Sequence, residues 1–64
     1  MADKLTWTEV RERTGMSSAE MASHLGMSRQ LYSMKERYIR PMRVEEATEI
    51  VRLAKVDIQK VRLK

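Results

Sequence analysis

Apolar residues recur along this chain at intervals of three and four residues, which is the period of an amphipathic helix. The longest series occupies the last third of the chain and steps by three and four in turn: Val44, Ala47, Val51, Ala54, Ile58 and Val61. A shorter series of Met21, Ala22 and Leu25 gives one apolar face to an earlier segment. The pattern therefore predicts an all-α fold of four to five helices, in a single domain spanning residues 1–64.

Two helix starts are marked by the S/T-x-x-E pattern of the capping box. In a capping box, the Ser or Thr side chain and the Glu side chain each accept a hydrogen bond from an otherwise unpaired backbone N–H. Thr6 with Glu9 predicts a helix from Trp7 to about Arg13, ended by Gly15. We expect Trp7 to anchor the core.

Residues 17–38 are predicted to form two short helices joined by a tight turn. Ser17 and Glu20 make the second capping box and start the first helix of this pair. Gly26 follows its last apolar residue, and glycine is the preferred residue for a left-handed helix end. Ser28 then stands where it can cap the next helix.

The C-terminal third is predicted to begin with a helix and to end in an ambiguous tail. Pro41 disfavours helix at the residue before it, so a break is expected there, and a helix follows from Val44 to about Lys55. In residues 56–64 the helical spacing is favoured, but the alternation of apolar residues also permits a short β-strand. This tail is too apolar to remain free, and we expect it to pack on the core or on a second copy through Ile58, Val61 and Leu63.

Composition excludes several functional classes. The chain has no cysteine and one histidine, His24, so disulfides and the usual zinc sites are excluded. It contains no Gly-rich phosphate loop and no nucleophile elbow, so we expect no enzymatic activity, and we expect no cofactor and no small-molecule ligand. No apolar run is long enough to cross a membrane, and no signal peptide is recognisable. The absence of cysteine fits a reducing cytoplasm, and we expect a cytoplasmic protein.

Positive charge is concentrated in one part of the chain. The net charge is +4, and residues 29–43 contain five basic residues and one acidic residue. A DNA-reading element and the loop after it would carry such an excess. A solvated basic loop explains it equally well.

The stretch LGMSRQLYSMKERY, followed by RP and a helical segment, resembles the helix–turn–helix of the phage repressor and Cro family, also called the lambda-repressor-like family. The resemblance covers about residues 16–55. The residues that match the family pattern are Leu25, Gly26, Ser28, Arg29, Gln30, Ser33, Glu36, Arg37 and Pro41.

The resemblance implies a sequence-specific regulator of transcription that binds double-stranded DNA, with its third helix in the major groove. The residues then expected to read base edges are Arg29, Gln30, Ser33 and Met34. Those expected to hold phosphates are Ser17, Ser18, Ser28, Arg37, Tyr38, Arg40 and Arg43. We expect a homodimer on DNA, and the resemblance implies the cytoplasm of a bacterial or phage-infected cell.

Three positions depart from the family pattern and keep an alternative function open. Ser18 replaces a usual Gln, Lys35 replaces a usual buried Trp or Ile, and Tyr38 replaces a usual Gly. In the family register Lys35 faces inward, and we expect its charge to reach water by snorkelling. A rotated register that buries Met34 instead would leave the proposed reading face outside. The alternative function is a protein-binding antirepressor or adaptor built on the same scaffold.

Overall fold

A computed structural model describes residues 4–63 and contains four α-helices and one short 3₁₀ helix in that part of the chain. No β-strand is present among these residues beyond one isolated bridge. The structure therefore confirms the predicted all-α class. In chain order the elements are α1 (Trp7–Thr14), α2 (Ser18–His24), α3 (Arg29–Glu36), α4 (Val44–Ala54) and η1 (Ile58–Lys60).

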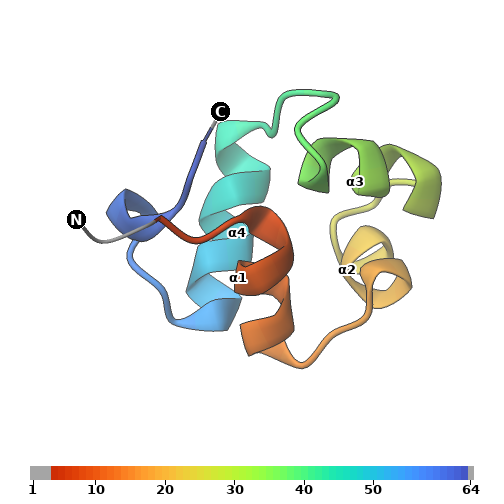
Figure 1. The fold of residues 1–64 in the computed structure, drawn as a ribbon. Helices are drawn as coiled ribbons and strands as arrows, with labels where there is room; N and C mark the ends of the chain where they lie inside the picture. The colour runs from red at the N-terminus through yellow and green to blue at the C-terminus, as the bar shows by residue number, and fades with distance from the viewer. Residues whose placement is uncertain (1–3, 64) are drawn as a thin grey trace.

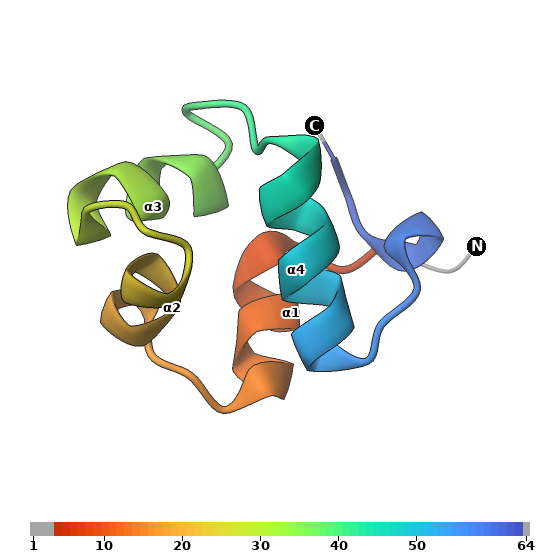
Figure 2. The same cartoon turned by 180° about the vertical axis from the view of Figure 1, so that it is seen from behind.

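The helices form two packed pairs that share one core. α1 packs against α4, and α2 packs against α3. In Figures 1 and 2 the α2–α3 pair lies at one end of the molecule, while η1 and the first described residues lie at the other. α3 is therefore an outer element, free of any covering helix on one side.

The core is made by residues from all four helices and from the tail. Its largest fully buried side chains are Trp7, Tyr32, Met21, Ile50, Val10 and Val61. The expectation that Trp7 anchors the core is confirmed, since only 1% of its surface is exposed.

The helix ends follow the predicted local chemistry. In the first capping box Thr6 accepts from the Glu9 N–H and Glu9 accepts from the Thr6 N–H, and Ser17 with Glu20 repeats this arrangement at α2. Gly26 is left-handed, with a φ of 73°, as predicted for the turn between α2 and α3. These contacts lie within four residues in sequence, which is why sequence pattern alone locates them.

The tail is neither the helix nor the β-strand that its sequence allows. α4 ends at Ala54, and Lys55 reverses the chain in a left-handed conformation with a φ of 58°. After η1 the tail returns to the first described residues: the Leu5 N–H donates to the Lys60 carbonyl at 2.8 Å, and the Arg62 N–H donates to the Leu5 carbonyl at 2.7 Å. These two bonds make a single parallel bridge between Leu5 and Val61. A helix continued to Val61 would prevent this bridge and remove Val61 from the core.

Candidate nucleic-acid interface

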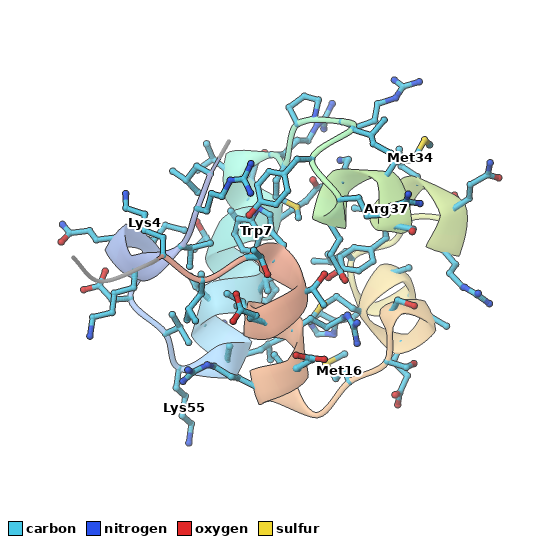
Figure 3. The ribbon with its side chains drawn as sticks, in the orientation of Figure 1. Lys4, Trp7, Met16, Met34, Arg37 and Lys55 are labelled. Atoms are coloured by element: carbon cyan, nitrogen blue, oxygen red, sulfur yellow. The ribbon has the colours of Figure 1, made fainter. Side chains whose placement is uncertain are left out.

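The outer face of α3 brings five of the predicted DNA-contacting residues together. They line one shallow hollow on the surface: Arg29, Gln30, Ser33, Met34 and Arg37. Arg29, Gln30 and Arg37 are exposed, while Ser33 and Met34 are half-buried. Met34 and Arg37 are labelled on α3 in Figure 3. This face combines guanidinium, amide, hydroxyl and thioether groups without a carboxylate, so it is suited to an anionic partner that presents hydrogen-bonding edges.

The inner face of α3 carries Tyr32 and Lys35, in agreement with the inward register. The prediction that Lys35 snorkels is wrong. Its side chain is only 10% exposed, and its Nζ lies 2.6 Å from Oε1 of Glu46 on α4. The ion pair compensates the burial of the ammonium, which would otherwise be costly.

Glu46 holds α3 and also starts α4. The oxygen that binds Lys35 also accepts a hydrogen bond from the Arg43 backbone N–H at 3.0 Å. Burial would raise the pKa of Glu46, but the bonds from Lys35 and Arg43 outweigh it, so the pKa lies below its usual value. Glu46 is therefore ionised at neutral pH, and its charge fixes one side of α3 to α4.

A second buried carboxylate, Glu36, fixes the end of α3 to α1. Arg11 donates from Nε to Glu36 at 2.9 Å, and the Thr8 hydroxyl donates to it at 2.7 Å. Burial tends to raise the pKa of Glu36, while the bonds from Arg11 and Thr8 bring it below its usual value. The Tyr32 hydroxyl lies near enough to influence that pKa, but it makes no hydrogen bond of normal geometry within residues 4–63. Burial, with the Glu36 charge beside it, raises the pKa of Tyr32.

Neither the contact of Glu46 with Lys35 nor that of Glu36 with Arg11 was predicted from the sequence. Glu36 was noted as a match to the family pattern, but its partners Thr8 and Arg11 lie 25 or more residues earlier in the chain. In sequence, Glu36 stands on the same side of the helix as Tyr32, and this position does not name a partner.

The Tyr38 hydroxyl, for which a phosphate contact was predicted, is hydrogen-bonded within the protein. Its hydroxyl accepts a hydrogen bond from the Trp7 backbone N–H at 3.3 Å and donates one to the Arg62 carbonyl at 2.5 Å. The Arg62 guanidinium lies over its ring, 4.7 Å from the centroid. Because its only proton is already donated within the protein, the hydroxyl could donate to a phosphate only by giving up the Arg62 carbonyl. Tyr38 is a structural link between α3 and the two ends of the fold.

The other predicted phosphate contacts fall into two groups. Arg40 and Arg43 are exposed and line a second hollow, which also includes the turn at Gly26. Ser17 and Ser28 are exposed helix caps whose oxygens accept backbone N–H groups, so their hydroxyl protons are not used by those bonds. Ser18 is half-buried in the first turn of α2. The three serines line neither of the two hollows.

The residues predicted for the core or a dimer contact separate into two kinds. Val61 is 1% exposed and belongs to the core of its own chain. Ile58 and Leu63 are 38% and 60% exposed, and they border an apolar hollow together with Val44, which is 77% exposed. Exposed apolar surface is therefore concentrated where the tail passes α4.

No protein-family model, curated protein or solved structure matches this chain. Within residues 4–63 no helix combines the length and apolar character needed to cross a membrane. The same residues contain no group of three or more His, Asp or Glu side chains placed to bind a metal ion.

Proposed function

We propose that this protein binds double-stranded DNA sequence-specifically as a regulator of transcription, with the N-terminal part of α3 entering the major groove. The observation that carries the proposal is the hollow on the outer face of α3, where Arg29 and Gln30 stand exposed at the start of the helix. Arg pairs with guanine O6 and N7, and Gln pairs with adenine N6 and N7, so these two side chains can distinguish base pairs.

The anchoring of α3 supports this proposal. Lys35 is bound to α4 through Glu46, and Glu36 is bound to α1 through Arg11. A helix that reads base edges must hold its side chains in a fixed orientation, and buried ion pairs on two neighbouring sides restrict its rotation. Arg37 follows on the same outer face, while Arg40 and Arg43 extend the basic surface beyond the end of the helix.

The family resemblance supports the same proposal. α2, the turn at Gly26 and α3 coincide with the segments that resemble the helix–turn–helix of the phage repressor and Cro family. Two departures from the family pattern are accommodated inside the protein, since Lys35 is paired with Glu46 and Tyr38 links α3 to the tail. They therefore do not call for a protein-binding role of the kind that an antirepressor would need.

We further propose that the protein binds DNA as a homodimer. Val44, Ile58 and Leu63 expose apolar side chains around one hollow, at which Trp7 and Met42 also lie. This patch lies on α4 and the tail, whereas the proposed reading face lies on α3, so both can be occupied at once.

Selection of bound duplexes from a random pool tests the main proposal. We expect enrichment of a defined sequence and a steep loss of affinity as salt rises, because phosphate contacts release counterions. Two half-sites in the selected duplexes would support the homodimer, and one would exclude it. Absence of binding at low salt by the folded protein would contradict DNA binding and favour the protein-binding alternative.

A further inference from the structure

A hollow with a cationic rim lies at the end of the molecule opposite to the outer face of α3. Its rim carries Lys4, Arg13, Lys55 and Lys60. In Figure 3 Lys4 and Lys55 lie on the other side of the α1–α4 pair from Met34 and Arg37. The hollow encloses about 500 Å³, which is room for several side chains rather than for a single ion. No proposed DNA contact lies in it.

The cations of this rim are not neutralised within the protein. None of the four forms an ion pair or a side-chain hydrogen bond with another residue in the range 4–63. Arg13 interacts with Glu9 at longer range, but the Glu9 carboxylate is already hydrogen-bonded to Thr6. Arg11 and Lys35, whose side chains are only 18% and 10% exposed, are by contrast paired with carboxylates. The rim therefore leaves a positive field available to a partner.

The floor of this hollow is apolar. Leu5 and Val56 are both half-buried and both contribute to its lining. They come from opposite ends of the described chain and are brought together when the tail pairs with Leu5. An apolar floor inside a cationic rim fits a partner that offers an apolar side chain flanked by negative charges.

The charges around the hollow favour the binding of carboxylates over the binding of the phosphates of a DNA duplex. Arg13 lies in the last turn of α1 and Lys55 caps α4, so the negative carbonyl ends of two helices point toward this region. Asp57 also lies in the lining, where its side chain accepts a hydrogen bond from the Gln59 N–H. These negative groups would repel the dense array of phosphates on a duplex. The positive charge that remains is enough to bind a few carboxylates.

We propose that this hollow binds an acidic peptide segment of a partner protein, with one apolar side chain on Leu5 and Val56 and flanking carboxylates against Lys4, Arg13 and Lys60. This proposal does not depend on DNA binding by α3. It assigns the basic surface of the molecule to two partners, one at each end.

Titration of the ¹⁵N-labelled protein with the acetylated, amidated pentapeptide Glu-Glu-Leu-Glu-Glu, followed by NMR, tests this proposal. We expect shifts of the Leu5, Val56 and Lys60 amides, with a dissociation constant of about 1 mM or tighter. The same peptide with Ser in place of Leu should bind at least about fivefold more weakly, because the apolar floor then has no partner. Equal binding of the two peptides would overturn the proposal.

The charge-lowering variant K4Q/K60Q should bind the Leu-containing peptide about fivefold or more weakly, since it lacks two exposed cations of the rim. Lys55 is left unchanged because its left-handed backbone makes it a poor site for substitution. The variant keeps the bridge to Leu5, which uses only the backbone of Lys60, and a thermal melt monitored by circular dichroism checks its fold.

The matched control is R37Q/R40Q, which removes two exposed cations from the opposite end of the molecule and should leave the peptide affinity unchanged. The proposal would be overturned if the peptide shifted only amides of α3 or shifted no amide at all. It would also be overturned if both variants lost peptide affinity equally. Equal loss of DNA affinity in both variants would show that duplex DNA occupies this hollow and would overturn the proposal too.

Discussion

Tyr38 holds together three parts of the chain that are distant in sequence. Its backbone is left-handed, with a φ of 66°, directly after α3, and its hydroxyl bridges the start of α1 and the tail. A left-handed tyrosine costs about 1 kcal/mol relative to the glycine usual at such a helix end. The two hydrogen bonds and the stacked Arg62 guanidinium offset that cost.

The variant Y38F tests this role. We expect it to lower the free energy of unfolding by about 1–2 kcal/mol, because the Trp7 N–H and the Arg62 carbonyl both lose their partner. The ring and its contact with the guanidinium remain. Urea denaturation measures the change, and DNA affinity per folded molecule should be unchanged. A large loss of DNA affinity without loss of stability would show that the hydroxyl contacts phosphate after all.

Replacing Gln30 on α3 and replacing Arg40 in the loop beyond it should impair DNA binding in different ways. Q30A should relax discrimination at one base pair by about 1–3 kcal/mol, whereas R40A should weaken binding to all sequences alike and reduce the salt slope by about one. Site selection repeated with each variant, together with salt titrations, measures both effects. If Q30A selects the same sequence as the unmodified protein, Gln30 does not read a base.

At the scale of the elements, carboxylates connect the helices. Glu36 joins α3 to α1, Glu46 joins α3 to α4, and Glu49 joins α4 to α2 through His24 at 2.7 Å. Glu49 also binds Arg52 at 2.6 Å. His24 therefore contacts a helix other than its own. Each of these three carboxylates, Glu36, Glu46 and Glu49, therefore links a pair of helices.

These contacts predict acid lability. The bonds from Arg52 and His24 lower the pKa of Glu49 to about 2 from its usual 4.5, and Glu36 and Glu46 are lowered in the same direction. A carboxylate with a lowered folded-state pKa stabilises the fold above its unfolded pKa, and this stability is lost as pH falls through the folded value. We therefore expect the free energy of unfolding to fall as pH decreases from about 4.5 toward 2.

The variant E49Q should reduce that dependence, because it removes one of the carboxylates that must be protonated. Chemical denaturation at a series of pH values measures the slope. The matched control is E45Q, since Glu45 lies exposed on the same helix and forms no ion pair in the described part of the chain. An unchanged slope in E49Q would show that its ion pairs do not contribute to folding.

Sequence pattern predicted the elements best where the deciding contact is local. The capping boxes at Thr6 and Ser17 and the turn at Gly26 depend on neighbours within four residues, and all three are as expected. The Lys35 side chain was assigned wrongly because its partner, Glu46, lies on another helix. The tail was ambiguous because its apolar spacing fits helix and strand alike, and only the pairing with Leu5 decides its path.

At the scale of the whole molecule, the exposed apolar patch of Val44, Ile58 and Leu63 should decide the oligomeric state. L63D places a charge in this patch without touching the core, so we expect it to convert the proposed dimer into a monomer and to reduce the selected DNA to one half-site. Sedimentation equilibrium measures the change. Q59E adds one negative charge outside the patch and should remain dimeric. A monomeric unmodified protein on DNA would contradict the dimer.

The bridge between Leu5 and Val61 means that the chain closes on itself. Because Leu5 and Val61 lie side by side, a short flexible linker that joins residue 4 to residue 63 would make a continuous ring. Such a cyclic protein loses less conformational entropy on folding, and its melting temperature should rise. In Figures 1 and 2 the tail and the first described residues lie on the side of α4 away from α3, so the outer face of α3 would stay free to bind.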